Sequence, residues 1–405
     1  MTTVSTTASP PETAPSQGTR PRALLFTSFE PSGDDHASTV IAELLRRHPD
    51  LKIYAWGGPE MQAAGAEIVE QTGKDAVMGV PGLAKIQEHR KINERVELWM
   101  DKNPIAAHIA VDSPAANFPI CKLAKKRNIR VVHLVAPQVW AWGKRRVKKL
   151  RRLTDMVLCL LPFEESWFEG KDVPAKYVGH PLFDIELDHD ALAASAATMP
   201  EGSPKIALFP GSRPKEHDRN FPLLLESFRR LKQDRPGAAG VVAATTPEVA
   251  KKLRAQAQNL GGWPDGLVIE THNTDAIVKW CDLSLVVSGT VTLQIARQQK
   301  PMVIVYKTGR LFYELVAKWL LTAPFFTLPN LIAGREIVPE LVPHFGDAEP
   351  IVQEATKLIE DESYAQQQRD DLGKVTQQFE TMDACVHAAD AIERVAGLKQ
   401  SAQAS

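Results

Sequence analysis

The chain is organised around the stretch Leu283-Ser-Leu-Val-Val-Ser-Gly-Thr-Val-Thr-Leu-Gln-Ile-Ala296, which is followed by Lys300-Pro-Met-Val-Ile-Val-Tyr306. The apolar runs predict a buried strand at Leu283–Val287 and another at Met302–Tyr306, with a tight turn and a helix from about Val291 between them. A strand, a turn and a helix in this order form the unit of a parallel α/β sheet.

The turn of this unit, Ser288-Gly289-Thr290, has the composition of a phosphate site. Gly289 lets the backbone approach a ligand closely. Hydroxyl groups are offered by Ser288, Thr290 and Thr292. Unpaired N–H groups and the positive end of the helix dipole attract a phosphate at such a place. An ordinary turn with Ser or Thr as N-cap explains the same residues, so the turn alone leaves both interpretations open.

A second turn of this type, Phe209-Pro-Gly-Ser-Arg213, follows a predicted strand at Lys205–Phe209. Gly211 and Ser212 can present N–H groups to a diphosphate, and Arg213 adds a planar cation. A plain turn with a surface arginine is the alternative. The residues after the turn are predicted to be a solvated helix start: Lys215, Glu216 and His217.

Composition limits the class of protein. The chain has 405 residues and a net charge of −1, which indicates two sizeable domains and gives no global attraction to nucleic acid. Four scattered cysteines fit a reducing compartment. No apolar run reaches the roughly 18 residues of a membrane span. We therefore expect a cytoplasmic protein that touches a membrane surface.

The order of apolar runs predicts two doubly wound α/β domains that face a cleft. Each predicted strand of the first half ends in polar, glycine or proline residues, at the edge where ligands bind in open α/β sheets. The predicted divisions are a disordered tail (1–20), an N-terminal domain (21–187), a linker (188–204), a C-terminal domain (205–350) and C-terminal helices that return to the N-terminal domain (351–405).

Three carboxylates are candidates for the chemistry. Asp112 ends an apolar strand just before Pro114, where it could act as a general base or simply cap the next helix. Glu30 and Asp34 follow the first predicted strand and are similar candidates. The pair Asp188-His-Asp190 resembles a metal-binding pattern but falls in the predicted linker. We therefore infer no metal and no other cofactor.

The segment from Trp140 to Arg152 predicts an amphipathic basic helix, because Val147, Leu150 and Leu153 recur at helical spacing. Its tryptophans and first cations are Trp140, Trp142, Lys144 and Arg145. Charge runs are commonly solvated faces, but two tryptophans beside many cations favour an anionic partner, either a phosphorylated substrate or an acidic membrane surface. Nothing in the segment indicates RNA binding.

A series of short motifs runs from residue 22 to about 345: Ser32-Gly33-Asp34, Gly57-Gly58-Pro59-x-Met61, Val77-Met78-Gly79, Asp112-x-Pro114, Val139-Trp-Ala-Trp142, Pro162-Phe163-Glu164, Val178-Gly-His-Pro-Leu182, Pro210-Gly-Ser-Arg213, Ser288-Gly-Thr290, Thr292-Leu293, Pro301-Met302-Val303, Leu328-Pro-Asn330 and Val338-Pro-Glu-Leu341. Together these motifs resemble the lipid-A-disaccharide synthase family of inverting GT-B glycosyltransferases.

The resemblance implies transfer of 2,3-diacylglucosamine from its UDP donor to 2,3-diacylglucosamine 1-phosphate. Asp112 would be the base, and Arg213 the UDP-binding arginine. Further UDP contacts would come from Gly211, Ser212, Ser288, Gly289, Thr290, Thr292 and Gln294. Acceptor or membrane contacts would come from Ser32, Asp34, Trp140, Trp142, Lys144 and Arg145. The partners would be the two lipid substrates and an anionic membrane surface, and a homodimer is left open.

The chain also departs from the family pattern. Ala115 and Ala116 precede Asn117 where the family has Asp and Phe, and Gln294 replaces a glutamate. Phosphate handling looks intact, whereas ribose and acceptor contacts are altered. Two alternatives stay open: another UDP-sugar enzyme on the same scaffold, such as a transferase to a non-lipid acceptor or a UDP-N-acetylglucosamine 2-epimerase, and a binder without turnover.

Overall fold

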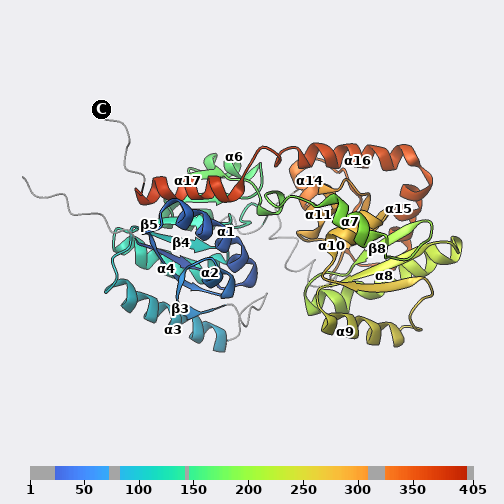
Figure 1. Cartoon of the computed structure of the whole chain (residues 1–405), viewed down its shortest axis with the longest axis horizontal. Coiled ribbons are helices and arrows are strands. Elements are labelled where there is room, and N and C mark those ends of the chain that lie inside the picture. The colour runs from blue at the N-terminus through green and yellow to red at the C-terminus, as the bar shows by residue number, and fades with distance from the viewer. Residues whose placement is uncertain (1–22, 73–82, 142–145, 309–323, 399–405) are drawn as a thin grey trace, which may run out of the picture.

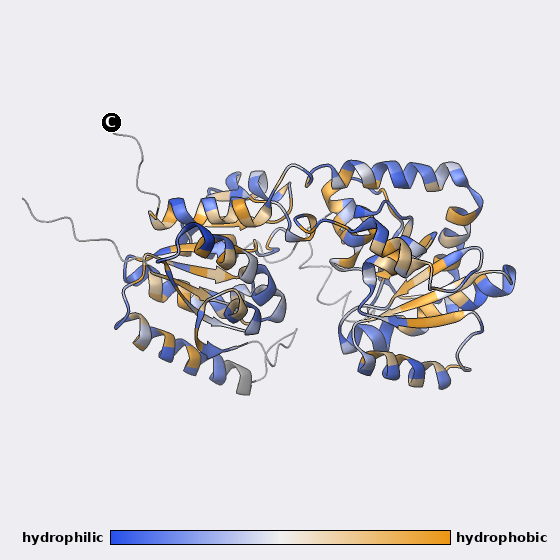
Figure 2. Cartoon of the chain, in the orientation of Figure 1, coloured by the Kyte–Doolittle hydropathy of each residue, from blue (hydrophilic) through white to orange (hydrophobic). Residues whose placement is uncertain are grey.

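The computed structural model describes residues 23–72, 83–141, 146–308 and 324–398. Figure 1 shows two α/β domains side by side, each built around one parallel sheet. The predicted fold class of two doubly wound domains is confirmed. Apolar residues concentrate on the strands and polar residues on the outer faces of the helices (Figure 2).

The N-terminal domain has a seven-stranded sheet in the order β3-β2-β1-β4-β5-β6-β7. Its strands are β1 (Ala23–Thr27), β2 (Lys52–Gly57), β3 (Glu67–Gln71), β4 (Ala107–Val111), β5 (Arg130–Leu134), β6 (Met156–Cys159) and β7 (Ala175–Tyr177). Its helices are α1 (Pro31–Arg47), α2 (Pro59–Ala63), α3 (Leu83–Met100), α4 (Pro114–Lys126), α5 (Val147–Leu153) and α6 (Glu164–Glu169), followed by the 3-10 turn η2 (Pro181–Phe183).

The C-terminal domain has a six-stranded sheet in the order β10-β9-β8-β11-β12-β13. Its strands are β8 (Lys205–Phe209), β9 (Ala239–Ala244), β10 (Leu267–Thr271), β11 (Leu283–Val287), β12 (Met302–Lys307) and β13 (Glu340–His344). The helices of this half are α7 (His189–Ala196), α8 (Pro214–Asp234), α9 (Pro247–Gln258), α10 (Thr274–Trp280), α11 (Val291–Arg297), α14 (Leu328–Ala333), α15 (Glu349–Glu360) and α16 (Glu362–Thr376).

The central strands are apolar because both faces of each sheet are covered by helices. In β1, Leu24 and Phe26 pack toward α1, while Ala23 and Leu25 face the core under α3, α4 and α5. Burying a side chain such as Phe26 contributes about 1.5–3 kcal/mol. The edge strands β3 and β7 lack this signal, since β3 alternates between half-buried and exposed residues and β7 has only three residues.

The predicted linker is partly helical. Asp188 accepts a hydrogen bond from the Ala191 N–H at 2.9 Å and caps α7. Leu192 and Ala196 of that helix pack against the core of the C-terminal domain. The difference from the predicted linker arises because an Asp N-cap and an alanine-rich segment are sufficient for a helix that has an apolar surface to cover.

The chain returns to the N-terminal domain through α17 (Ala384–Ala396), which packs on α1 beside the strands (Figure 1). Ala388 and Ile392 enter the core around β1. The contact is also ionic, because the Arg47 guanidinium donates to Asp390 at 2.8 Å and to the buried Glu393 at 3.4 Å.

The two passages between the domains contact each other. The rings of Phe183 and Phe379 are stacked with centroids 4.3 Å apart. Arg297, at the end of α11, donates to the Leu182 carbonyl at 2.9 Å and to the Ile185 carbonyl. Among the described residues, no helix combines the length and apolar character that crossing a membrane requires.

Candidate functional site

The turn between β4 and α4 carries Asp112. Asp112 (φ 45°) and Ser113 (φ 35°) both adopt the left-handed backbone region, which residues other than glycine rarely occupy. Such a conformation costs about 1–3 kcal/mol per residue and persists only where neighbouring contacts hold it. One of these contacts is the hydrogen bond from the Asp112 N–H to the Leu134 carbonyl of β5, at 2.9 Å.

The carboxyl group of Asp112 is half-buried, and this burial raises its pKa above the ordinary value. The negative charge of Glu30 raises the pKa further, whereas the positive charge of Arg213 lowers it. Asp112 and Arg213 belong to different domains, so the charge of Arg213 acts on Asp112 across the domain boundary. A carboxylate with a raised pKa is better suited to accept a proton near neutral pH.

Glu30 lies next to the same turn. Its Oε1 accepts a hydrogen bond from the Ser113 hydroxyl at 2.7 Å. Ser32, in the first turn of α1, is exposed. Two of the three carboxylate candidates, Asp112 and Glu30, are therefore brought together by the fold.

Asp34 has a structural task instead. It is buried, and its carboxylate accepts hydrogen bonds from the N–H groups of Gly58, Glu60 and Met61 at 2.9, 2.9 and 3.2 Å. These groups start α2, so Asp34 caps that helix from a distance in the sequence. The acceptor contact predicted for Asp34 has no exposed carboxylate to support it.

The Pro-Gly-Ser-Arg turn follows β8, as predicted, with Gly211 at φ 99°. The Glu216 carboxylate accepts from the N–H groups of Ser212 and Arg213 at 3.0 and 3.2 Å, and from the Arg213 guanidinium at 3.1 Å. The prediction that the Ser212 N–H is presented to a ligand is therefore not met in this structure. The reason is local: Glu216 stands at the third position of α8, where its side chain reaches back to the turn.

The predicted solvated start of α8 is wrong at two of its three residues. Glu216 and His217 are buried. The His217 ring nitrogen Nε2 lies 2.9 Å from the Gly211 carbonyl. Charged and polar side chains fold back here because the turn offers them N–H and carbonyl groups. The Arg213 side chain remains half-exposed, at 51%.

The Ser-Gly-Thr turn follows β11 and precedes α11, as predicted. Gly289 and Thr290 are exposed, and their backbone N–H groups donate to no other described residue. The Ser288 hydroxyl lies 3.4 Å from the Phe326 carbonyl. Of the two predicted phosphate turns, this one has backbone donors open for a ligand.

Two further predicted UDP contacts lie on α11. Thr292 is fully buried, and its hydroxyl donates to the Gly289 carbonyl at 2.7 Å, which braces the turn from behind. Gln294 is half-buried, and its side chain bonds to no other described residue. Thr292 thus supports the turn, and Gln294 keeps its amide available.

Trp140 is buried, and its Nε1–H donates to the Glu164 carboxylate at 2.8 Å. Its ring packs edge-on against Phe163, with centroids 5.0 Å apart. A contact between Trp140 and a membrane would require this side chain to leave its partner. Trp142, Lys144 and Arg145 lie outside the described residues. In α5, Val147, Leu150 and Leu153 are buried and Lys148 and Lys149 exposed, which confirms the predicted amphipathic helix over Val147–Leu153.

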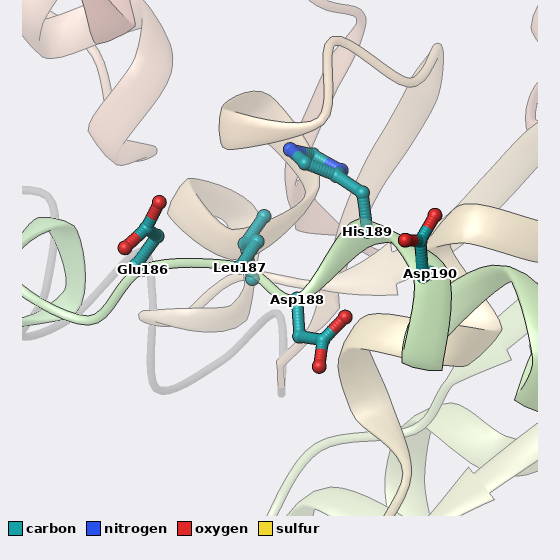
Figure 3. A pocket seen from close by; sticks show the side chains of 5 residues that line it. All are labelled: Glu186, Leu187, Asp188, His189 and Asp190. Carbon is teal, nitrogen blue, oxygen red and sulfur yellow. The ribbon is translucent and has the colours of Figure 1, made fainter.

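The segment 186–190 lines a hollow beside the passage between the domains, and Figure 3 shows its side chains. Asp188 and Asp190 point in different directions there, and Asp188 caps α7 (Figure 3). That the pair arises by chance stays a prediction. Another group, Asp184, Asp383 and Cys385, brings possible metal ligands together at the start of α17. Asp184 and Asp383 cap that helix, and burial raises the pKa of Cys385 to about 12, so its thiol is protonated.

The sequence interpretation missed some supporting residues. Glu340, at the start of β13, accepts from the N–H groups of Phe326 and Thr327 at 2.8 and 3.1 Å, which holds the segment that Ser288 contacts. The side chain of Asn117 donates to the carbonyls of Val111 and Asp112. Both residues stand in motifs quoted above, but a motif does not say which groups its members bind.

Comparisons with known proteins point to one family. The sequence profile described as "Lipid-A-disaccharide synthetase" matches residues 24–395. A lipid-A-disaccharide synthase of Geobacter metallireducens is 34% identical over 389 residues, which are 94% of this chain and 97% of the relative. One of Pseudomonas syringae pv. tomato is 34% identical over 391 residues, 95% of this chain and 100% of the relative.

Solved structures support the fold. The crystal structure of the glycotransferase of kitacinnamycin has a TM-score of 0.60 at 16% identity, covering 93% of this chain and 99% of that one. UDP-GlcNAc 2-epimerase of Neisseria meningitidis, bound to UDP-GlcNAc, has a TM-score of 0.58 at 11% identity, covering 92% and 99%. These two give the GT-B-like architecture, and the sequence match is the finer evidence: the chain belongs to the lipid-A-disaccharide synthase family.

Proposed function

We propose that the chain is a lipid-A-disaccharide synthase. It transfers 2,3-diacylglucosamine from UDP-2,3-diacylglucosamine to 2,3-diacylglucosamine 1-phosphate, giving the β-1,6-linked disaccharide 1-phosphate and UDP. The observation that carries this proposal is the match of residues 24–395 to the family, and the electrostatic effect of Arg213 on Asp112 across the domain boundary supports it.

The reaction is an inverting displacement in this proposal. The acceptor hydroxyl oxygen attacks the anomeric carbon while the bond from that carbon to the diphosphate breaks. Asp112 takes the hydroxyl proton, and negative charge develops on the departing UDP. A half-buried carboxylate with a raised pKa fits the role of base, which commonly contributes about 10²–10⁴ in rate.

The departing diphosphate is stabilised by protein groups. The N–H groups of Gly289 and Thr290 and the half-exposed guanidinium of Arg213 are its proposed donors. Each donor aimed at a developing negative charge is worth about 2.7–4 kcal/mol in the barrier. No divalent metal is assigned a step, because these groups supply the positive charge that the step needs.

The proposed lipid partners also require a surface. The exposed cations of α5, including Lys148 and Lys149, form a basic face that fits an anionic glycolipid or an acidic bilayer. We propose peripheral association through this face, on the cytoplasmic side of the inner membrane. Contacts from Trp142, Lys144 and Arg145, and a homodimer, stay predictions.

The substitution Asp112→Asn tests the proposal, with Asp50→Asn as an exposed control in the same domain. UDP affinity and disaccharide formation are measured in parallel, and the product is identified by mass and linkage. We expect UDP binding to be kept and turnover to fall by about 10²–10⁴. If turnover stays within about threefold of wild type, Asp112 is not the general base, and Glu30→Gln becomes the next test. A product that is an epimer of the donor would refute the synthase assignment.

A further inference from the structure

Asn117 stabilises the strained turn that carries Asp112. Asn117 lies in the first turn of α4 and is completely buried, so it cannot touch a substrate. Its Nδ2 donates to the Val111 carbonyl and to the Asp112 carbonyl, both at 2.9 Å. These two carbonyls flank the point where the backbone enters the left-handed region. Asn117 therefore binds the backbone at the start of this left-handed turn.

The direction of the hydrogen bonds around Asn117 is determined by chemistry. Since two carbonyl oxygens require donors, the NH₂ group of Asn117 must face them, and its Oδ1 must face the other way. The Thr27 hydroxyl lies 2.6 Å from that Oδ1 and donates to it. The single proton of the hydroxyl is then used, so Thr27 can only accept from its second partner.

That partner is His108. Its Nε2 lies 2.8 Å from the Thr27 hydroxyl oxygen, so Nε2 carries the proton and donates. Thr27 and His108 are both completely buried, on the neighbouring strands β1 and β4. Burial and the nearby His133 lower the pKa of His108 to about 3, which keeps its ring neutral. The result is a one-way chain from His108 through Thr27 and Asn117 to the backbone of the Asp112 turn.

We infer that Asn117, Thr27 and His108 are positioning residues for the reaction, which hold Asp112 in the orientation that its work as a base requires. The inference rests on the proposed role of Asp112. Burying a chain of polar groups costs free energy. When each hydrogen bond in the chain has one direction, the chain holds the groups that it joins in one conformation. Here it ends on the two carbonyls that define the turn, and a small displacement of a catalytic group can cost about 10²-fold in rate.

Thr27 offers a matched pair of substitutions. Thr27→Val has nearly the same shape but lacks the hydroxyl, whereas Thr27→Ser keeps the hydroxyl and loses a methyl group. We expect Thr27→Val to lower kcat by about 10- to 10²-fold, with KM and UDP affinity within about twofold of wild type. Thr27→Ser should retain most of kcat. Equal losses in both variants would mean that packing matters and not the hydrogen bond, which would overturn the inference.

A double-mutant cycle separates this inference from the proposed function. In the Asp112→Asn background, Thr27→Val should change the residual turnover by less than about twofold, because its effect acts through Asp112. Full additivity overturns the inference, as does a normal kcat in Thr27→Val when Asp112→Asn is impaired. If Asp112→Asn itself is fully active, the proposed base is wrong whatever Thr27 does. Should Thr27→Val not fold, His108→Gln, which keeps a donor, and His108→Leu, which lacks one, give the same comparison.

Discussion

We predict that the free energy of unfolding depends on pH because of the buried carboxyl group of Glu164. Its side chain is almost completely buried, and it accepts hydrogen bonds from Trp140 Nε1 at 2.8 Å and from the Leu161 N–H at 3.0 Å. Burial raises the pKa of Glu164 from 4.5 to about 7, although these two bonds act in the opposite direction. The folded state therefore holds the proton of Glu164 more tightly than the unfolded state does.

The sign of the effect follows from this difference. Between about pH 5 and pH 7 the folded protein keeps the Glu164 proton while the unfolded chain has lost it, so the free energy of unfolding falls as the pH rises. With pKa values of 4.5 and about 7, linkage gives a loss of about 2.5 kcal/mol between about pH 5 and pH 8. Above that range the penalty is complete and no longer changes.

Glu164→Gln isolates this contribution, because glutamine does not titrate. Its NH₂ group must face one of the two donors, so the variant loses about 1–3 kcal/mol at every pH. Urea unfolding followed by tryptophan fluorescence is measured for both proteins at three pH values. The stability advantage of wild type over the variant should shrink by about 2.5 kcal/mol from about pH 5 to pH 8. An advantage that stays constant with pH refutes the raised pKa.

Three other perturbations have defined outcomes. Gly211→Ala places a Cβ 2.5 Å from Glu216 Oε2 at a residue with φ 99°, so UDP affinity should fall by about tenfold or more. Gly262→Ala is the control: this residue has φ 94° and open space around it, so UDP binding measured by calorimetry should stay unchanged. Ile392→Ala should destabilise the N-terminal domain by about 2–5 kcal/mol in thermal unfolding. The same change at the exposed Ile185 is the control and should have little effect. Equal effects of the two changes would contradict the packing of α17 in the core. Reversing Lys148 and Lys149 to Glu should weaken binding to anionic vesicles at least tenfold, because each positive charge removed costs about 1 kcal/mol. The same change at the exposed pair Lys251 and Lys252 is the control. Unchanged vesicle binding would mean that α5 is only a solvated face.

The fold could be predicted because its central strands are nearly continuous apolar runs. Strands β1, β4, β8 and β11 have both faces covered, and their residues are almost all buried. The edge strand β3 could not be found in the same way, since Glu67, Glu70 and their neighbours need only one covered face. The hydrophobic pattern of a strand reflects how much of the strand is buried, so a strand with only one covered face gives a weaker signal.

The places of the candidate residues in the fold could be predicted, but their hydrogen bonds could not. Asp112, Gly211 and Gly289 lie at the carboxyl ends of strands, where a parallel sheet places ligand contacts. The partner of Asp34 could not be predicted, because the N–H groups that it caps belong to α2, beyond an intervening helix and strand. The sequence predicts Trp140 as a contact for acceptor or membrane, but its Nε1–H donates to Glu164, and no local pattern reveals this pairing.

The two turns proposed to bind the diphosphate differ in whether their backbone N–H groups are already bonded to the protein. At α8, the Glu216 carboxylate already accepts from the Ser212 and Arg213 N–H groups, so a phosphate there would have to displace a negative charge. At α11, the Gly289 and Thr290 N–H groups bond to no described residue. In the proposed site a diphosphate therefore meets less competition at α11, where these two N–H groups belong to exposed residues. We propose that Arg213 acts on the diphosphate chiefly through its guanidinium, which is half-exposed and lowers the pKa of Asp112. In that role its positive charge opposes the negative charge that develops on the leaving group.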